Sequence, residues 1–148
     1  MKMVVVVSLL LLQIILATAS SSNDPCGVSG RWTNQLGAFM TVSCQVGPVV
    51  PTEGTVTGQY TSPSNHSYDI SGRYSMIGGD CNLGFSVAIG NDDGNSNITS
   101  WTGIHYGSED SIHTKWLLSR NTEYNDKWKN TNFGSSVLIR ENRRTRIL

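Results

Sequence analysis

The sequence predicts an all-β protein, namely an eight-stranded antiparallel up-and-down β-barrel. Leu83, Phe85, Val87 and Ile89 alternate with small residues, which is the period-two pattern of a strand with one buried face. Turn-rich segments separate such runs at regular intervals, and no convincing long helix interrupts them. An even number of short, evenly spaced strands is typical of a barrel or a sandwich. A barrel of eight strands is just wide enough to hold one small ligand.

The first two strands are predicted as a hairpin over 30–42, in which two β-prone runs flank a tight Asn-Gln-Leu-Gly connection at 34–37. Segments rich in Gly, Asn, Asp, Pro and Ser then divide the body of the chain into further short runs. These remaining strands are expected at 56–62, 67–74, 83–89, 98–106, 112–119 and 135–140.

The N-terminus has the pattern of a secretory signal. Lys2 precedes an apolar run that ends at Ala17-Thr18-Ala19, small residues at the spacing of a signal-peptidase site. We expect residues 1–19 to be this signal, and residues 20–148 to form the barrel domain with a short basic C-terminal tail. No later apolar run is long enough to cross a bilayer, so the sequence predicts a secreted protein without a membrane anchor.

The charge balance argues against a nucleic-acid partner. The chain has eleven basic and eleven acidic residues, and loss of Lys2 leaves ten and eleven. Binding to nucleic acid through release of counterions needs a clear basic excess. The one local excess is a C-terminal run that favours a solvated tail: Arg140, Arg143, Arg144 and Arg146.

The sequence also argues against catalysis and metal binding. It contains no Gly-x-Ser-x-Gly, no His-Glu-x-x-His and no phosphate-cradling glycine loop. His66, His105 and His113 are scattered and have no cysteine or carboxylate pattern beside them. We therefore expect neither an enzyme nor a metal site, and no cofactor.

Three cysteines in a secreted chain predict one disulfide and one remaining thiol. The predicted strands place Cys26 before the first strand, Cys44 at the end of the second and Cys81 before the fifth, all at one end of the meander. Three pairings are therefore open.

Polar and aromatic side chains share strand faces that would point into a barrel. Trp32 and Asn34 are two residues apart, so a strand would put both on one side. Because burying an amide without a partner costs about 1–3 kcal/mol, Asn34 should meet a core partner, a turn or a ligand. The same parity pairs three more sets of residues: Tyr60 with Ser62, Thr99 with Trp101, and Trp116 with Leu118.

The order of these motifs resembles the avidin and streptavidin family. The resemblance runs from about Cys26 to about Glu141, in register and with plausible spacing. The motifs are Gly30-Arg31-Trp32-Thr33-Asn34 with Leu36-Gly37, then Thr57-Gly58-Gln59-Tyr60, Leu83-Gly84-Phe85-Ser86-Val87-Ala88, Trp101-Thr102-Gly103, Thr114-Lys115-Trp116-Leu117-Leu118 and Trp128-Lys129.

This resemblance implies a barrel end that holds biotin, as a ligand and not as a cofactor. Asn34 and Tyr60 match residues that donate to the ureido oxygen, and Ser62 matches the acceptor for one ureido N–H. Thr99 matches the residue that meets the thioether sulfur, and Asn97 stands where a small hydroxyl residue meets the carboxylate tail. The apolar walls would be formed by Trp101, Trp116 and Leu118, with Tyr68 nearby.

The resemblance also implies a homotetramer, in which Trp128 reaches into the site of a neighbouring subunit. Three positions depart from the family pattern and put affinity in doubt. Ala38 replaces a serine that donates to the ureido oxygen, Ser136 replaces an acceptor for the second ureido N–H, and Ile89 replaces a tryptophan of the ring cage.

The family disulfide joins the position of Cys26 to that of His105, so its second cysteine is absent here and we favour Cys26–Cys81 instead. Two sequons occur, at Asn65 and Asn97. We expect Asn97 to face the pocket, to stay unmodified and to donate its amide N–H to the ligand carboxylate. Asn65, in a loop, is the better candidate for a glycan.

The prediction is thus a secreted, non-enzymatic biotin-binding barrel. An alternative is an extracellular structural or interaction protein of the same fold with a degenerate pocket. A third, less favoured interpretation is a carrier for another small apolar ligand.

Overall fold

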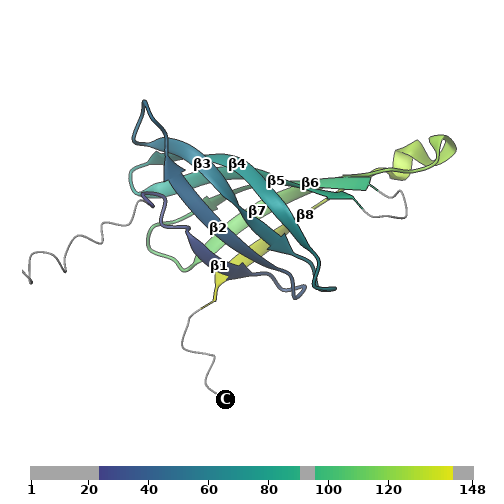
Figure 1. Cartoon of the computed structure of the whole chain (residues 1–148), viewed down its shortest axis with the longest axis horizontal. Coiled ribbons are helices and arrows are strands. Elements are labelled where there is room, and N and C mark those ends of the chain that lie inside the picture. The colour runs from purple at the N-terminus through teal and green to yellow at the C-terminus, as the bar shows by residue number, and fades with distance from the viewer. Residues whose placement is uncertain (1–23, 91–95, 142–148) are drawn as a thin grey trace, which may run out of the picture.

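The computed structural model describes residues 24–90 and 96–141, which form a closed barrel of eight antiparallel strands in chain order (Figure 1). The predicted fold class is confirmed. The strands are β1 Gly30–Thr33, β2 Phe39–Val46, β3 Glu53–Thr61, β4 Ser67–Ile77, β5 Asp80–Gly90, β6 Ser96–His105, β7 Ser111–Arg120 and β8 Thr131–Arg140.

The barrel closes through its shortest strand. β1 has four residues, all paired with β2, and it meets β8 at only two register positions, Trp32 with Arg140 and Thr33 with Ile139. Arg140 strengthens this short seam, because its guanidinium donates to the carbonyl oxygens of Ser29 and Gly27. The same guanidinium lies 4.2 Å above the Trp32 ring. Closure therefore depends on one side chain as well as on the ladder.

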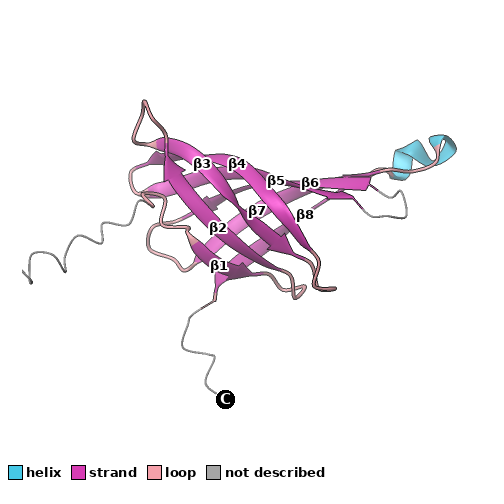
Figure 2. Cartoon of the chain, viewed as in Figure 1, coloured by secondary structure: helices cyan, strands magenta, loops and turns pink. Residues whose placement is uncertain are grey.

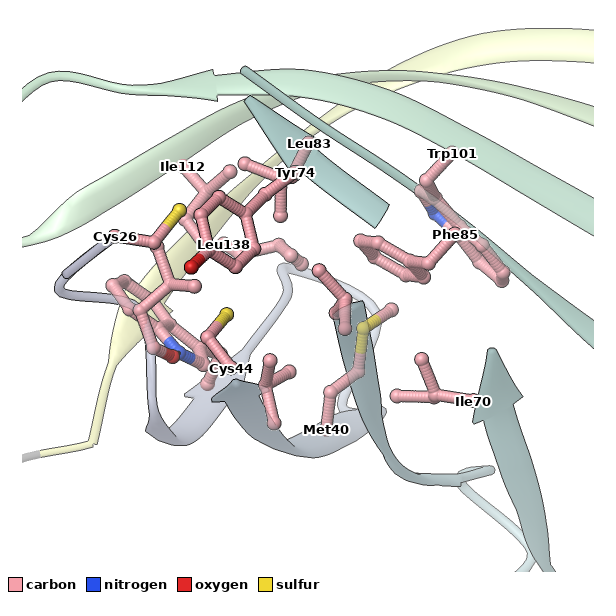
Figure 3. Close-up of a cluster of buried hydrophobic side chains, with 14 of the residues drawn as sticks. Cys26, Met40, Cys44, Ile70, Tyr74, Leu83, Phe85, Trp101, Ile112 and Leu138 are labelled. Carbon is pink, nitrogen blue, oxygen red and sulfur yellow. The ribbon is translucent and has the colours of Figure 1, made fainter. Parts of the chain in front are cut away.

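Alternation along β5 places its apolar residues in the core. Cys81, Leu83, Phe85 and Val87 are buried, whereas the residues between them lie on the outer wall. Figure 3 shows Leu83 and Phe85 among the buried side chains of the other strands, with Trp101 beside Phe85. The period-two pattern seen in the sequence is therefore the pattern of barrel interior and exterior.

The hairpin between β4 and β5 turns more tightly than the sequence prediction assumed. Gly78 and Gly79 both have positive φ, 61° and 100°, which suits a two-residue turn. Such a turn lets β4 run to Ile77 and β5 begin at Asp80, so both strands are longer than expected. Cys81 therefore lies inside β5, and its expected place before that strand was wrong.

Cys26 and Cys81 form a disulfide with a Cα–Cα distance of 5.4 Å, one of the three pairings open to the sequence. Cys44, on β2, is the free and buried cysteine. The bridge ties the segment before β1 to the start of β5 at one end of the barrel.

A short 3-10 helix, η1 (Tyr124–Lys129), lies in the connection between β7 and β8. Figure 2 shows it in cyan at one end of the molecule, beyond the ends of the strands. None of its six residues is buried.

The predicted signal over 1–19 and most of the basic tail lie outside the described residues. Within the described part of the chain, no helix has the length and apolar character needed to cross a membrane.

Candidate functional site

Three aromatic rings stack inside the barrel, toward the end that carries the β1–β2, β3–β4 and β7–β8 connections. The Trp101 indole stacks on Phe85, with ring centroids 5.4 Å apart and planes inclined by 17°. The Tyr60 ring also approaches the Trp101 ring, with centroids 5.9 Å apart and planes tilted by 38°. β3, β5 and β6 contribute one ring each, so the stack forms only when these strands assemble in the sheet. Figure 3 labels the Trp101–Phe85 pair.

Trp116 adds a second indole, directly opposite Trp101 in the β6–β7 register. Its ring lies over the backbone of Gly134, its register partner on β8. A Cβ atom at Gly134 would come within 2.3 Å of Cζ2 of Trp116, so only glycine leaves room for this ring. Sequence reasoning missed Gly134, because the last strand was predicted to begin at 135 and this glycine lay outside it; a glycine inside a strand signals a close approach of this kind.

Tyr60 and Tyr68 are register partners on β3 and β4 and are both partly buried. Burial raises the pKa of Tyr60, and the neighbouring phenol of Tyr68 raises that pKa further. The Tyr60 hydroxyl therefore stays protonated at neutral and moderately alkaline pH, and it can donate a hydrogen bond to an oxygen of a ligand.

Asn34 found its partners in the chain itself. Its Oδ1 accepts hydrogen bonds from the backbone N–H groups of Leu36 at 2.9 Å and of Ala38 at 3.1 Å. This Asx-type turn fixes the β1–β2 connection and occupies the oxygen. The Nδ2 group of Asn34 is then the part of the amide that can donate hydrogen bonds to a ligand.

Ser62 is engaged in the β3–β4 connection. Its Oγ accepts from the backbone N–H of His66 at 3.2 Å and shares a hydrogen bond with Ser64 Oγ at 2.9 Å. One lone pair is thus used, and the hydroxyl can still accept from a ligand if Ser64 donates to a different acceptor. The Ser62 side chain is half-buried and lies at the same end of the barrel as the aromatic stack.

The row of residues next to the indoles is Thr99, Leu118 and Asn132, which are register partners on β6, β7 and β8. Thr99 is buried, and Leu118 is half-buried. Asn97, two residues before Thr99, shares its parity and has a buried Oδ1. This oxygen has no hydrogen-bond partner among the described residues.

The three departures from the family pattern all lie on inward-facing positions. Ala38 is 2 % exposed and Ser136 is 6 % exposed, and Ile89 packs against the core. Asn34 and Ser136 line one groove between the β1–β2 connection and β8. The methyl group of Ala38 thus stands where the family resemblance implies a hydroxyl donor. The short hydroxyl of Ser136 stands where it implies an acceptor for the second ureido N–H.

Trp128 does not join the barrel set. It lies on η1, its side chain is 75 % exposed, and Lys129 Nζ lies 4.8 Å from its ring centroid. Tyr124 on the same helix is 78 % exposed, with Lys127 above its ring. An exposed indole on a segment with no buried residue needs a partner from elsewhere, or stays solvated.

An exposed cluster of Glu109, Ser111 and His113 superficially resembles a hydrolytic triad. Its geometry excludes that role, because the same ring nitrogen, Nε2 of His113, contacts both Glu109 Oε2 at 3.0 Å and Ser111 Oγ at 3.3 Å. A triad histidine uses one nitrogen for each partner. Among the described residues there is also no group of three or more His, Cys, Asp or Glu side chains placed to hold a metal.

The structure thus brings most of the predicted site residues to one end of the barrel interior: Tyr60, Tyr68, Asn97, Thr99, Trp101, Trp116 and Leu118. Asn34 and Ser62 lie in connections at that end, and Trp128 stands apart. A larger groove on the outer wall, bordered by Arg73, Asn82 and Lys115, shares none of these residues.

A closed eight-stranded barrel with polar and aromatic side chains gathered inside one end belongs to the class of small ligand-binding β-barrels. The sequence model of the avidin family matches residues 22–141. The chain belongs to the avidin family, whose members are non-enzymatic binders, as the sequence predicted.

Individual relatives are distant. Avidin from Gallus gallus is 29 % identical over 141 residues, which cover 89 % of this chain and 90 % of avidin. Avidin-related protein 4/5 from the same organism is 29 % identical over 139 residues, covering 89 % of each chain. Avidin-related protein 3, also from Gallus gallus, is 27 % identical over 140 residues, covering 90 % of each chain.

Proposed function

We propose that this protein binds biotin in the barrel end that carries the aromatic stack. The observation that supports this most is the set of rings from Phe85, Trp101 and Tyr60, with Trp116 facing Trp101 across the β6–β7 ladder. Aromatic rings of this kind suit a rigid bicyclic ligand, because stacking and burial would stabilise it while little conformational entropy is lost.

The polar groups around the stack suit the ureido end of biotin. The Tyr60 hydroxyl remains protonated, and the Asn34 oxygen is held by the backbone, so Nδ2 is left to donate. Both groups would donate to the ureido oxygen. Ser62 would accept from one ureido N–H, and Thr99 would meet the sulfur.

The departures should weaken binding without abolishing it. Ala38 and Ser136 each remove one expected hydrogen bond, and one bond contributes on the order of 0.5–1.5 kcal/mol. Together they would cost about one to three decades in affinity, and Ile89 would add lost ring contact. The double variant Ala38→Ser with Ser136→Asn should therefore slow biotin dissociation, and an unchanged rate would count against these roles.

The competing interpretation is an avidin-fold extracellular protein whose pocket is degenerate. It is favoured by the same three positions, Ala38, Ile89 and Ser136. Calorimetric titration of the mature protein with biotin separates the two. Saturable heat at one biotin per chain supports the binder, and no heat from folded protein supports the degenerate pocket.

We further propose that the protein is secreted after removal of residues 1–19, and that residues 20–148 make up the mature chain. The disulfide is consistent with an oxidising compartment. Asn65 is exposed in the β3–β4 connection and can carry a glycan, whereas the buried oxygen of Asn97 disfavours one there. Peptide mass mapping of the secreted protein tests both sites.

A homotetramer is the proposed assembly, with Trp128 completing a neighbouring site. Its support is the exposure of this indole on a helix with no buried residue. Trp128→Ala should then weaken biotin binding, while Tyr124→Ala serves as a matched control on the same helix. Unchanged biotin affinity in Trp128→Ala would refute the shared site.

A further inference from the structure

The edge of β8 that faces β1 stays free over most of its length. β1 pairs with β8 only at two positions, Trp32 with Arg140 and Thr33 with Ile139, because the chain turns away at Asn34. In Figure 1 the β7–β8 hairpin runs on past β1 toward η1. The part of β8 before Ile139 therefore has a partner strand on one side only, which is β7.

Hydrogen bonds at the end of β8 show which backbone groups point to the free side. The N–H of Glu141 donates to the carbonyl oxygen of Arg31 on β1, whereas the N–H of Arg140 points the other way, to the β6–β7 connection. Backbone groups alternate in this manner along an antiparallel strand. Ser135 and Val137 have the parity of Glu141, so their N–H and C=O groups point away from β7. Among the described residues no hydrogen bond engages these four groups.

A groove of about 540 Å³ runs beside these backbone groups. Residues 33–35 line one side of it, and Ser135, Ser136, Val137 and Ile139 line the other. No residue that lines it carries a charge. Its volume lies within the range of ligand sites, about 300–1,000 Å³. An extended peptide matches such a groove, because its main chain offers donors and acceptors at the spacing of a strand edge.

The free edge also lacks the features that usually protect one. Soluble proteins place Lys, other charged residues or Pro on exposed strand edges, and these prevent pairing with another chain. The stretch Thr131–Ile139 contains none of them. Large apolar side chains flank it on the outer wall, where Phe133 is 83 % exposed and Val137 is 39 % exposed. An uncharged edge with an apolar flank suits an uncharged partner strand.

We propose that the free edge of β8 binds an extended, uncharged peptide segment of a partner as an added antiparallel strand. The site lies at the β1–β8 seam, and it does not depend on the proposed biotin binding. Main-chain hydrogen bonds to Ser135 and Val137 hold the peptide.

The register of this pairing sets the side chains that the site accepts. The peptide residue opposite Val137 points outward beside it, so a β-branched apolar residue fits there. The next residue lies opposite Ser136, which is 6 % exposed, and points toward the barrel interior, so it must be small. The third lies opposite Ser135 on the outer wall, where a threonine fits. The preferred core sequence is therefore Val-Ala-Thr.

The experiment titrates the folded mature protein, without biotin, with the capped peptide acetyl-Thr-Val-Ala-Thr-Ser-amide and follows backbone amides by NMR. Saturable binding with a dissociation constant at or below about 1 mM is expected, with the largest shifts at Ser135 and Val137. Methylation of the nitrogen that follows Ala blocks an N–H that faces β8, so it should weaken binding about tenfold. Methylation of the Ala nitrogen, which faces away, is the matched control and should have less than about a twofold effect.

Two variants test the protein side of the pairing. Ser135→Pro removes an N–H that β7 does not use, so the variant should fold and bind the peptide about tenfold more weakly. Ser135→Ala keeps the N–H and separates loss of the side chain from loss of the amide hydrogen. Thermal melting checks folding, and the two methylated peptides decide the matter if Ser135→Pro is not folded.

Hydrogen exchange tests whether the edge is free before any peptide is added. The amides of Ser135 and Val137 should exchange faster than those of Gly134 and Ser136, which point to β7. Slow exchange at both would mean that the edge is already covered. If Ser135→Pro then also lowers the mass in sedimentation, the occupant is a second copy of the chain, and the peptide site is wrong.

Absence of saturable shifts at about 10 mM peptide would overturn the inference, whether or not the protein binds biotin. Equal weakening by the two methylated peptides would overturn it as well, because binding would then not follow the free edge.

Discussion

Cys81 lies directly opposite His105 across the β5–β6 ladder, and both residues are tied to Cys26. Cys81 forms the disulfide with Cys26, and the ring nitrogen Nδ1 of His105 lies 3.2 Å from the carbonyl oxygen of Cys26. The family resemblance placed the second cysteine at position 105. In this chain the covalent link has moved one strand along the barrel, and a histidine contact remains at the original position.

Removal of this disulfide should destabilise the barrel strongly. The bridge closes a loop with a sequence separation of 55, for which the chain-entropy model gives about 4 kcal/mol. Urea unfolding of the double variant Cys26→Ala with Cys81→Ala measures the loss. Cys44→Ala leaves the bridge intact and is the control for a buried sulfur alone. A loss no larger than in this control would contradict a structural role for the bridge.

Arg140 should contribute more to the free energy of unfolding than an ordinary surface arginine. It gives hydrogen bonds to Ser29 and Gly27 and covers the Trp32 ring across the short β1–β8 seam. Loss of two charge-assisted bonds and a cation–π contact predicts about 2–4 kcal/mol for Arg140→Ala. Arg140→Lys should recover only part, because lysine lacks the planar fork.

The control is Arg73→Ala, an exposed arginine on β4 whose removal should change the free energy of unfolding by less than about 0.5 kcal/mol. Equal effects at the two positions would show that the seam does not depend on Arg140.

The buried Cys44 thiol should make stability fall at alkaline pH. Burial, and secondarily the charge of Asp24, raises the pKa of Cys44 from 9.0 to about 12. Between these values the unfolded chain releases a proton that the folded chain retains, so the free energy of unfolding decreases as pH rises. The slope reaches about 1.4 kcal/mol per pH unit for one proton, and the contribution is fully present below pH 9.

Urea titrations of wild type and Cys44→Ala between pH 7 and 10 measure this slope. The difference in stability between the two proteins should shrink above pH 9, because alanine has no proton to lose. Parallel curves over the whole range would mean that the thiol is not held protonated by the fold.

Gly134 should be required for the position of the Trp116 indole. A methyl group there would collide with the ring, so Gly134→Ala should cost about 1–3 kcal/mol through overpacking and should weaken biotin binding. Gly84→Ala is the matched control, since its added Cβ meets only a carbonyl oxygen of Trp101 at 3.7 Å. Intrinsic tryptophan fluorescence and thermal melting follow the two effects. Identical behaviour of both variants would contradict the close approach.

The fold could be predicted from the sequence because inside–outside alternation is local. Each of Leu83, Phe85 and Val87 carries its own polarity signal, and the structure buries all three. Strand ends were less predictable, since they depend on turn geometry. The two positive φ angles at Gly78 and Gly79 bring Cys81 into β5, and this follows only when the whole hairpin is considered.

The sequence could predict site residues whose inward direction follows from strand parity alone, as at Thr99 and Trp101. It could not predict residues whose partners come from distant strands. Asn132 and Gly134 were missed because the predicted last strand began at 135, and their importance depends on the β7–β8 register. The Asn34 amide shows the same limit, because its partners, Leu36 and Ala38, depend on the exact turn.

Calorimetric titration of the folded, mature protein with biotin tests the central claim most directly, with Trp116→Ala titrated alongside. The proposed pocket predicts saturation at one biotin per chain with a dissociation constant below about 1 μM, and a loss of at least about tenfold in the variant. No heat of binding at millimolar biotin, from protein whose circular dichroism shows an intact barrel, would contradict it.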